Sequence, residues 1–378
     1  MLQILNLSKQ YDNKMEGITN GIHQISLSIE KGKMFSLLGP SGCGKTTTLR
    51  SIAGLERPDS GTIIVGSHAV FDSTRGIYIP PYKRGIGMVF QSYAIWPHMN
   101  VYENAAFPLT SGKKRLQPSV LKEKVHKALD AVQLLDYKDR RATLLSGGQQ
   151  QRLALARALV MEPDLILLDE PLSNLDAKLR ESMRFELKRI QRELNITMVY
   201  VTHDQAEALA LSDEIAIMRS GHIVQMNDPR TLYHKPNSKF VADFMGSTNF
   251  LKGTVHKWSK EEQVAVIETV QGSFAACYNG DLTLGQPILL SIRPENIRLT
   301  AGAPAAIEDS PAFGEYRNHL SGSVVNAAFL GDSLDYIIDA GDQELQIRTQ
   351  SDLDVHLGDR ITVHLPMEKC MLIPMEDR

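Results

Sequence analysis

The eight residues GPSGCGKT, from Gly39 to Thr46, constrain the fold of this chain more than any other segment. They fit the pattern G-x-x-x-x-G-K-S/T, follow a short apolar run and precede a helical run over residues 47–53. In that context the glycines turn main-chain N–H groups toward phosphate oxygens, and the helix N-terminus adds positive partial charge. We therefore expect an α/β nucleotide-binding domain in which Lys45 reaches the β- and γ-phosphates and Thr46 binds Mg²⁺. A chance glycine turn is the alternative, and its rate is roughly one chain of this length per hundred before context is counted.

Two adjacent carboxylates follow a second apolar run. Residues 165–168 read LILL and lead directly into Asp169 and Glu170. At the end of a buried strand, Asp169 is suited to hold Mg²⁺ through its waters, and Glu170 is suited to polarise an attacking water. A solvated acid pair at a strand end is the plain alternative, and the phosphate-binding pattern in the same chain makes it the weaker one.

A serine and two glycines head another helical run at residues 145–152, LSGGQQQR. Ser146 is a suitable N-cap, and Gly147 and Gly148 expose N–H groups at the start of the helix, so this is a second phosphate-binding surface. One chain rarely needs two such surfaces for one nucleotide. A chain that pairs head-to-tail with a second copy does, because each LSGGQ segment then closes on the partner's nucleotide. Alone, the segment would read as an ordinary helix cap.

Hydrophobic runs and helical patterns alternate up to about residue 240. The runs at residues 35–38, 165–168 and 196–202 are typical of strands buried on both faces of a parallel sheet. Apolar residues recur with helical spacing from Leu121 to Leu135 and from Leu179 to Leu194, and each stripe is expected to be a core face.

From about residue 241 the helical patterns stop, and short β-like runs alternate with Gly and Asp turns, which is typical of a small barrel or sandwich. Residues 301–311 indicate an exposed loop. Residues 1–240 carry 31 Lys and Arg against 24 Asp and Glu, and residues 241–378 carry 10 against 20, so the net charges are +7 and −10. The basic part suits anionic nucleotides, and the acidic part disfavours nucleic acid. The β-like runs are residues 263–270, 287–292, 321–330, 335–338, 345–349 and 360–365.

Composition excludes several classes of protein. The cysteines Cys43, Cys277 and Cys370 are an odd number without metal-binding spacing, which predicts free thiols in a reducing compartment. No stretch approaches the roughly 18 apolar residues of a membrane helix, and the first residues lack the features of a signal peptide. A secreted disulfide scaffold, a zinc protein and an integral membrane protein are therefore poor interpretations.

The motifs, in their order along the chain, resemble those of one family, the ATP-binding subunits of ABC transporters. That order is the loop at residues 39–46, Gln91, the LSGGQ segment, the pair at residues 169–170 and His203. The resemblance implies an α/β P-loop NTPase, namely an ABC ATPase cassette over residues 1–240 with a helical subdomain at about 92–160.

The resemblance extends to the second part of the chain. Residues 291–295 (SIRPE) and 329–332 (FLGD) are similar to recurring segments in the maltose, sulfate, polyamine and ferric-iron group of importer ATPases. It implies that residues 241–378 form an all-β, OB-like regulatory domain built from two small barrels.

Further roles are implied by the same resemblance. Gln91 is similar to the Q-loop glutamine that touches Mg²⁺ or the attacking water, and residues 92–104 would face membrane subunits. The apolar stretch from Ile95 to Met99 suits docking, although a core-packed loop is the alternative. Tyr11 resembles the aromatic residue that stacks on adenine, although the stretch at residues 12–21 is longer than usual in the family.

Two more positions depend on the motifs around them. His203 follows an expected strand and is similar to the histidine that contacts the γ-phosphate, whereas a lone histidine is more often structural. Asn174 stands in a segment similar to the D-loop, where the family often has alanine. Cys43 is expected to be a small loop residue rather than a nucleophile. The nearby helix N–H groups could acidify its thiol, and alkylation would block nucleotide binding sterically.

These interpretations together give the expected site residues. The nucleotide-binding residues are Tyr11, Gly39, Pro40, Ser41, Gly42, Cys43, Gly44, Lys45, Thr46, Thr47, Ser146, Gly147, Gly148 and Gln149. The magnesium-binding residues are Thr46, Gln91 and Asp169, and the catalytic residues are Glu170, His203, Lys45 and Gln91.

The resemblance implies an ATPase that energises solute import. Its cofactors would be ATP and Mg²⁺, and its partners a second copy, two integral membrane permease subunits and, indirectly, a solute-binding protein, at the cytoplasmic face of the inner membrane. The amino-acid sequence around residues 95–104 is most similar to that of ferric-iron importers, with polyamine and phosphonate importers as alternatives. A soluble ABC ATPase of DNA repair or translation is disfavoured, because such proteins usually carry two cassettes or a long coiled coil. Binding of nucleic acid through the barrels is disfavoured by their charge.

Overall fold

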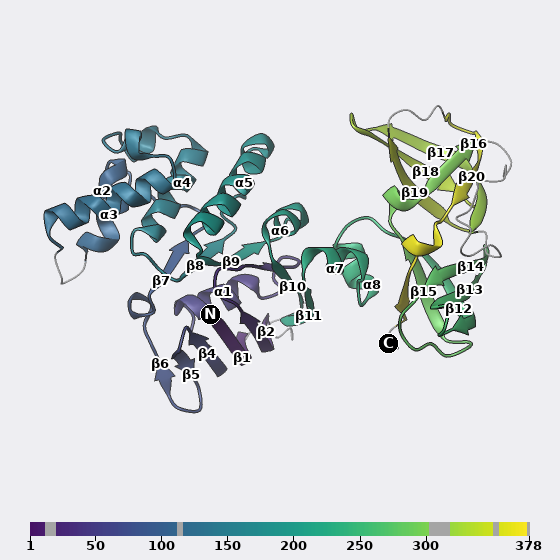
Figure 1. The fold of residues 1–378 in the computed structure, drawn as a ribbon, viewed down its shortest axis with the longest axis horizontal. Coiled ribbons are helices and arrows are strands. Elements are labelled where there is room, and N and C mark those ends of the chain that lie inside the picture. Colours follow the sequence, from purple (N-terminus) through teal and green to yellow (C-terminus); the bar gives the residue numbers. More distant parts are fainter. Residues whose placement is uncertain (12–19, 112–115, 302–317, 351–354, 376–378) are drawn as a thin grey trace. The chain divides into compact units, whose positions relative to one another are not determined.

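The computed structural model describes residues 1–11, 20–111, 116–301, 318–350 and 355–375 (Figure 1). The chain divides into two compact units, Met1–Arg230 and Thr231–Arg378, a little before the expected boundary near residue 240. Most of the expected long stretch at residues 12–21 lies outside the described residues, as does the expected loop at 301–311 beyond its first residue.

A six-stranded sheet crosses the first unit in the order β11-β10-β3-β9-β8-β7, and all neighbours are parallel except β11 and β10. Leu165 and Leu167 of β8 pack into one core, and Ile166 and Leu168 pack into the other. Both faces are therefore covered, which explains the unbroken apolar run. The strands are β3 (Met34–Leu38), β7 (Ile86–Val89), β8 (Leu165–Asp169), β9 (Thr197–Thr202), β10 (Glu214–Arg219) and β11 (His222–Asn227).

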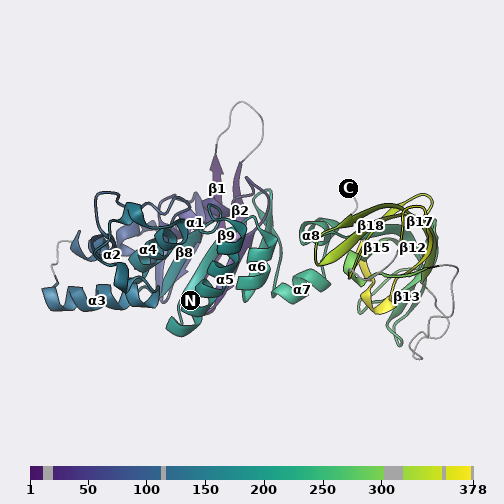
Figure 2. The ribbon, with the colours of Figure 1, turned by 90° about the horizontal axis from the view of Figure 1, so that it is seen from above.

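A second, antiparallel sheet of order β2-β1-β4-β5-β6 shares one of these cores. Helix α1 (Lys45–Ala53) adds Leu49 and Ile52 to that core, so it packs with strands of both sheets (Figure 2). The sequence analysis missed this sheet, because register shifts in β1 break the apolar–polar alternation of a half-buried strand. The strands are β1 (Leu2–Tyr11), β2 (Asn20–Ile29), β4 (Ser60–Val65), β5 (His68–Asp72) and β6 (Ile77–Tyr78).

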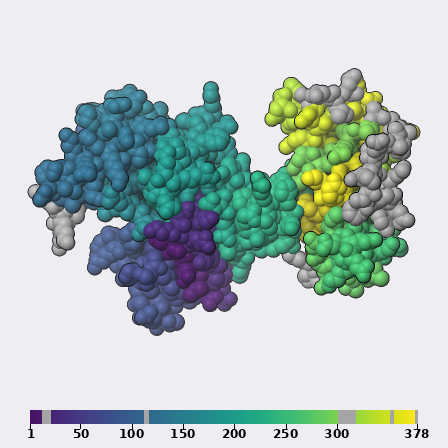
Figure 3. Space-filling view, viewed as in Figure 1, coloured from purple at the N-terminus to yellow at the C-terminus, as the bar shows by residue number. Residues whose placement is uncertain are grey.

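Helices cover the other face of the parallel sheet. The residues of α2 and α3, coloured blue, form one end of the first unit in Figure 3. Helices α2, α3 and α4 contact one another within the predicted helical subdomain. The stripe from Leu121 to Leu135 is divided, since α3 ends at Ala131 and Leu135 begins a short 3₁₀ turn. The α-helices are α2 (Val101–Thr110), α3 (Pro118–Ala131), α4 (Gly147–Leu159), α5 (Ala177–Leu194) and α6 (Gln205–Leu211), and the 3₁₀ turns are Pro81–Lys83, Leu135–Tyr137 and Ala142–Leu144.

The second unit combines two short helices with two five-stranded antiparallel sheets, of order β14-β13-β12-β15-β21 and β16-β20-β17-β18-β19. Both sheets contribute to one core. The fully buried Arg293 donates to the carbonyl oxygens of Ala242 (2.7 Å) and Gly246 (2.6 Å), which ties the segment after α8 to the sheets. All six expected β-like runs coincide with strands.

The bounds in the second unit are as follows. The helices are α7 (Pro229–His234), in which the unit begins, and α8 (Lys239–Phe244), with 3₁₀ turns at Pro294–Asn296 and Met367–Lys369. The strands are β12 (Asn249–Ser259), β13 (Val264–Thr269), β14 (Gly272–Cys277), β15 (Pro287–Ile292), β16 (Arg298–Ala301), β17 (His319–Phe329), β18 (Ser333–Asp339), β19 (Glu344–Gln350), β20 (Arg360–His364) and β21 (Met371–Pro374).

Candidate active site

Four of the sequence motifs meet at one edge of the parallel sheet. Strands β3, β7, β8 and β9 run in the same direction, and their carboxyl ends lead to Gly39, Gln91, Glu170 and His203 respectively. Ligands of open α/β sheets bind at this edge. The direction of the strands therefore brings the expected phosphate-binding, metal-binding and water-activating groups together, and this edge is the candidate active site.

The glycine-rich loop fits closely against neighbouring main chain. A Cβ atom on Gly39 would lie 2.3 Å from the carbonyl oxygen of Met218, and one on Gly44 would lie 2.9 Å from that of Gly21. Gly44 also has φ of 104°, a value that other residues rarely adopt. The loop therefore depends on glycine at both positions for its path from β3 into α1.

The first turn of α1 offers its N–H groups to a ligand. Gly44 is the N-cap, and it has no side chain that could accept a hydrogen bond from this turn. The first N–H groups of a helix have no partner within the helix, and together with the helix dipole they attract an anion. The structure therefore has a helix terminus suited to phosphate at the place where the sequence predicts one.

Lys45 lies beneath this loop with only 5% of its surface exposed. Its ammonium group donates to the carbonyl oxygens of Gly39 (2.7 Å) and Pro40 (2.9 Å). In the part of the chain that the structure describes, no carboxylate lies within ion-pair distance of Lys45. Its remaining contact is with Cys43 Sγ (3.8 Å), so all of these partners are uncharged. A buried cation with only neutral partners needs an anion, and a nucleotide phosphate would meet that need.

Tyr11 lies at the end of β1, where its main chain pairs with that of Asn20. The next residue of β2, Gly21, is the one whose carbonyl oxygen faces Gly44. The Tyr11 side chain is 38% exposed, with the ammonium group of Lys9 5.6 Å from its ring centroid. The ring is thus accessible on a strand whose neighbour runs beside the phosphate-binding loop.

Asp169 and Thr46 bring a carboxylate and a hydroxyl together where the sequence predicts a metal site. The Thr46 hydroxyl lies 3.4 Å from a carboxylate oxygen of Asp169, which is 7% exposed. Burial raises the pKa of Asp169, and nearby Arg50, followed by the Thr46 hydrogen bond, opposes that rise. Across the described ranges, no group of three or more His, Cys, Asp or Glu side chains could hold a metal alone. One carboxylate and one hydroxyl suit Mg²⁺, which takes its other oxygen ligands from water and substrate phosphates.

Glu170 has contacts with both of the other expected catalytic side chains. The amide nitrogen of Gln91 lies 3.3 Å from one carboxylate oxygen, and His203 Nδ1 lies 3.3 Å from the other. The backbone of Glu170 is left-handed, with φ of 44°, and its N–H donates to the carbonyl of Val201 (3.0 Å). The carboxylate is thus held in a fixed direction at the end of β8, with an amide and an imidazole beside it.

The LSGGQ segment forms the start of α4 as the sequence predicts. Ser146 is the N-cap, its side chain accepts from the N–H of Gln149, and Gln149 Oε1 accepts from the N–H of Ser146. A Cβ atom on Gly148 would lie 3.0 Å from the Leu179 side chain, so α5 packs closely against this turn. Among the described residues, the hydrogen bonds of Ser146 and Gln149 stay within this turn. The surface is therefore available to a second molecule.

The sequence analysis missed several side chains that hold the turn at residues 91–94. Arg157 of α4 donates to the carbonyl oxygens of Tyr93 (2.7 Å) and Ala94 (2.5 Å). Asn174 Nδ2 donates to the carbonyl oxygen of Gln91 (2.9 Å), and the Ser173 hydroxyl lies 3.3 Å from the Gln91 amide nitrogen. Asn174 was assigned only to the D-loop, and no local pattern around Arg157 marks it, because its partners are main-chain atoms far away in sequence.

The stretch after the Q-loop turn is neither fully exposed nor fully buried. Tyr93 is buried, Ile95 packs on the helical core, and Trp96 is 39% exposed with its ring 5.1 Å from that of Phe107. A hollow of about 360 Å³ opens beside these residues. Both sequence interpretations, docking surface and packed loop, thus describe part of this segment. Residues that line the hollow include Phe90, Trp96, Phe107, Pro108, Arg157 and Met161.

The expectation that the Cys43 thiol is acidified is wrong. Cys43 is buried in the loop, and burial raises the pKa of its thiol, with the Lys45 charge acting in the opposite direction. Its Sγ lies 3.8 Å from the Lys45 ammonium nitrogen. The cost of desolvating a thiolate therefore exceeds the stabilisation by the adjacent cation and N–H groups.

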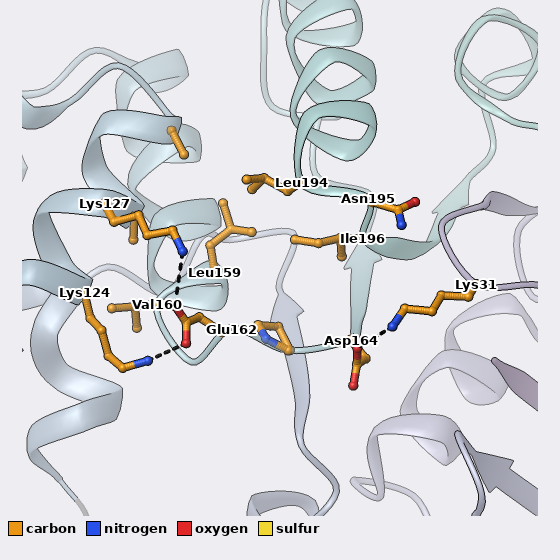
Figure 4. Close-up of a pocket in the computed structure, with 13 residues that line it drawn as sticks. Lys31, Lys124, Lys127, Leu159, Val160, Glu162, Asp164, Leu194, Asn195 and Ile196 are labelled. Atoms are coloured by element: carbon orange, nitrogen blue, oxygen red, sulfur yellow. Dashed lines mark hydrogen bonds and ion pairs between the residues drawn. The ribbon is translucent and has the colours of Figure 1, made fainter.

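A different hollow, of about 320 Å³, lies at the opposite edge of the sheet, next to the residues that precede β8 and β9 (Figure 4). Its floor includes Leu159 and Ile196, and its rim carries ion pairs of Glu162 with Lys124 and Lys127. Because none of the sequence motifs reaches this edge, the hollow is separate from the candidate active site.

The fold and the site define an ATPase cassette followed by a β-rich domain. The sequence matches the ABC transporter family over residues 22–173 and the TOBE domain family over residues 290–373. A spermidine/putrescine import ATP-binding protein, PotA, of Rubrobacter xylanophilus is 41% identical over 379 residues, covering 98% of this chain and 93% of that protein. The PotA 2 protein of Pseudomonas aeruginosa is 43% identical over 339 residues, covering 90% and 87%.

The chain thus belongs to the family of ABC importer ATPases that carry a C-terminal OB-like domain. A dimeric structure of a bacterial ABC transporter cassette is 30% identical, with a TM-score of 0.52, covering 61% of this chain and 99% of that one. The same scores relate the chain to a dimeric cassette in a post-hydrolysis state bound to ADP and Pi. Members of this family bind and hydrolyse ATP to drive transport, and so does this chain. The two cassettes of known structure are dimers. No helix within the described residues is long and apolar enough to cross a membrane.

Proposed function

We propose that this chain hydrolyses ATP to drive the import of spermidine, putrescine or a closely related polyamine through separate permease subunits. The observation that carries the choice of solute is a sequence identity of 41% over 98% of the chain to a protein with that named role. Ferric iron, the first expectation from sequence, finds no support among these relatives, whose names favour the polyamine alternative.

In this proposal, the phosphate groups of ATP bind at the amino end of α1. Lys45 exchanges the carbonyl oxygens of Gly39 and Pro40 for phosphate oxygens, and the N–H groups of the loop surround the same phosphates. Thr46 and Asp169 hold Mg²⁺, directly or through its waters. When bound, Mg²⁺ neutralises charge on the β- and γ-phosphates. Tyr11 stacks on the adenine ring, which its exposure on the adjacent strand pair supports.

Glu170 is the proposed general base, or at least the group that orients the attacking water. Gln91 and His203 approach its two carboxylate oxygens and thereby fix the carboxylate. Gln91 is also proposed to touch Mg²⁺ or the attacking water, and His203 is proposed to contact the γ-phosphate. Glu170, Gln91 and His203 would thus orient the attacking water, accept its proton and stabilise charge on the transferring phosphoryl group, which are the main requirements of phosphoryl transfer.

Each ATP site is proposed to need the α4 terminus of the second copy. Ser146 and Gly147 are exposed at the start of α4, and the N–H groups of this turn and the serine hydroxyl are suited to a γ-phosphate. Charge on the transferring group would then be stabilised from both chains, by Lys45 of one and by residues 146–148 of the other.

The hollow beside Trp96 and Phe107 is the proposed docking site for a permease subunit. It is lined largely by apolar side chains, one wall is the segment that follows Gln91, and Met161 at its rim is 54% exposed. An apolar helix from a permease would cover these side chains. This assembly places the chain at the cytoplasmic face of the inner membrane.

The second unit is proposed to regulate rather than catalyse. It contains none of the motifs at the active site, and its acidic charge disfavours nucleotide binding. Because Ala242 of α8 is buried with Leu289 and Ile373 of the second unit, a truncation is best made at Arg230. Such a truncation, if folded, should bind Mg-ATP within about tenfold of the whole chain, which is about 1.4 kcal/mol.

Reconstitution with its permease and binding-protein partners tests the proposal. Vesicles that contain the complex should accumulate labelled spermidine or putrescine in the presence of Mg-ATP, and the Glu170→Gln chain should abolish that uptake. Ferric iron and a phosphonate serve as alternative solutes. Accumulation of either of these without polyamine uptake would overturn the proposed solute while leaving the ATPase in place, and absence of ATP hydrolysis by the wild-type complex would overturn both.

A further inference from the structure

The turn after Gln91 has a conformation that its own sequence does not favour. Tyr93 and Ala94 both have left-handed backbones, with φ of 59° and 46°. Left-handed residues other than glycine cost roughly 1–2 kcal/mol each, and they persist only where their surroundings determine them. The Tyr93 side chain is buried in the helical core, which fixes one point of the turn.

Arg157 fixes the turn at the peptide groups themselves. One guanidinium nitrogen donates to Tyr93 O at 2.7 Å and the other to Ala94 O at 2.5 Å, so both left-handed residues are held by one planar group. Arginine suits this task because its donors form a rigid fork, which lysine lacks. Burial lowers the pKa of Arg157, so these two carbonyl groups are its main compensation for lost hydration.

Arg157 belongs to the same helix as the LSGGQ segment. It lies 11 residues beyond Ser146 in α4, roughly 16 Å along a helix that rises 1.5 Å per residue. A helix of this length moves as a rigid body over short displacements. A shift of Ser146 therefore reaches the carbonyl groups of Tyr93 and Ala94 through Arg157.

The other side of Gln91 is attached to the loop after Glu170. Asn174 donates to Gln91 O, while the Gln91 side chain approaches Glu170 and Ser173. A displacement transmitted to Ala94 must therefore turn Gln91 about a held carbonyl group. The movable part is the side-chain amide, 3.3 Å from the proposed base.

We infer that Arg157 is a positioning residue that couples the two ATP sites of a pair: when the second copy's nucleotide engages Ser146, Arg157 moves the turn at residues 93–94 and sets Gln91 against Glu170. This inference rests on the proposed function, since it requires the paired sites described there. It adds a route between the sites, which runs from α4 to Gln91 within one chain. Arg157 also lines the hollow proposed for the permease, so an occupant there would act on the same route.

Trp96 reports on this turn directly, because it follows Ala94 by two residues and the chain has only one other tryptophan, Trp258. The experiment uses the full chain with Trp258→Phe and Glu170→Gln, so that ATP binds and pairs form without turnover. Mg-ATP should change the Trp96 emission. The added substitution Ser146→Arg should remove that change by preventing engagement, and Arg157→Ala should remove it while pairs still form by gel filtration.

Steady-state kinetics in the otherwise wild-type chain give the second readout. Arg157→Ala should lower kcat by about tenfold, the equivalent of 1.4 kcal/mol, and leave KM for ATP within about twofold. Arg157→Lys should recover part of the loss, since one carbonyl group can still be contacted. Arg84 is the matched control, because it is buried and, like the partly buried Arg157, donates to main-chain carbonyl oxygens, in this case those of Ser51, Ile52 and Ile79. Arg84→Lys should lower stability and leave the Trp96 response intact.

The outcomes separate the two claims. If the Trp96 response survives Arg157→Ala but not Ser146→Arg, or if kcat is unchanged by Arg157→Ala, the coupling role is overturned and the proposed function stands. Equal loss of the response with Arg84→Lys would reduce Arg157 to a general contributor to stability and overturn the inference. A wild-type chain without ATP hydrolysis would overturn the proposed function and, with it, this inference.

Discussion

The starts of helices α1 and α4 are both suited to phosphate, but they are built differently. At α1 the N-cap is Gly44, which offers no side chain to the first turn, and the buried Lys45 lies directly beneath. At α4 the N-cap is Ser146, and a reciprocal pair of hydrogen bonds with Gln149 already satisfies part of the turn. One terminus is incomplete without an anion, and the other is stable without one.

This difference assigns the two termini to different steps. An uncapped turn above a buried cation gains the most from phosphate, so α1 should bind ATP in a single chain. A capped turn gains less, because a ligand must compete with the Ser146 hydroxyl for one N–H group. We therefore expect the start of α4 to contact phosphate only when a second chain presents the nucleotide already bound at its own α1. This contact would then form only in the paired state.

The largest expected effect is that of Lys45→Ala. This change removes the cation beneath α1, so nucleotide binding and hydrolysis should both be lost, because no other ammonium group replaces it in the loop. Titration with a fluorescent ATP analogue measures binding, and phosphate release measures hydrolysis. If Lys45→Ala bound nucleotide within a few-fold of the wild-type affinity, the claim that α1 depends on its buried cation to bind ATP, unlike α4, would be wrong.

Ser146→Arg should separate binding from hydrolysis at the other terminus. A bulky cation at the start of α4 should block engagement of the second copy, so hydrolysis should be lost while nucleotide affinity stays within about twofold. Mixing Lys45→Ala chains with Ser146→Arg chains should restore part of the activity, because one site of the mixed pair is intact. Ser146→Ala is the milder control and should cost about 1 kcal/mol of stability through the lost cap.

Glu170→Gln should leave the starts of α1 and α4 able to bind phosphate, and it should slow the hydrolysis of the bound ATP. Turnover should fall by about 10²–10⁴, and ATP should trap a stable pair that gel filtration detects. The amide keeps the size of the side chain and its contact with His203, so the loss reports on proton transfer and water orientation. Hydrolysis at the wild-type rate would show that another group is the base.

The smallest expected effect concerns Cys43, in the loop that precedes α1. Because burial raises the pKa of this thiol, its thiolate fraction at pH 8 is below that of a free cysteine, and alkylation by iodoacetamide should be slow there and faster as the pH rises. The raised pKa also makes the free energy of unfolding depend on pH. The folded state keeps the thiol proton to a higher pH than the unfolded state does, so this contribution to stability is present below the ordinary thiol pKa. It is lost as the pH rises from there through the folded-state pKa. Mass spectrometry, with Cys43→Ser as the control, follows the reaction, and rapid modification at pH 7 would contradict the burial argument.

The residues assigned to phosphate, metal and water were easier to predict from the sequence than the residues that hold the turn after Gln91 in place. The sequence alone identifies Lys45, Asp169 and Ser146, because each lies in a local pattern whose spacing is set by one loop or one helix turn. Arg157 and Asn174 do not, because their partners are carbonyl oxygens of residues 91–94, and no side-chain pattern records a main-chain acceptor. The antiparallel sheet was missed for a related reason, since bulges in β1 disturb the period on which strand prediction depends.

The left-handed backbone of Glu170 has a further consequence for how this protein could evolve. A glutamate in that conformation costs roughly 1–2 kcal/mol, whereas glycine adopts it freely. Glu170→Gly should therefore raise the melting temperature of a chain that no longer hydrolyses ATP, as differential scanning calorimetry would detect. Selection for stability alone would discard this carboxylate, so its presence at that φ is the signature of selection for turnover.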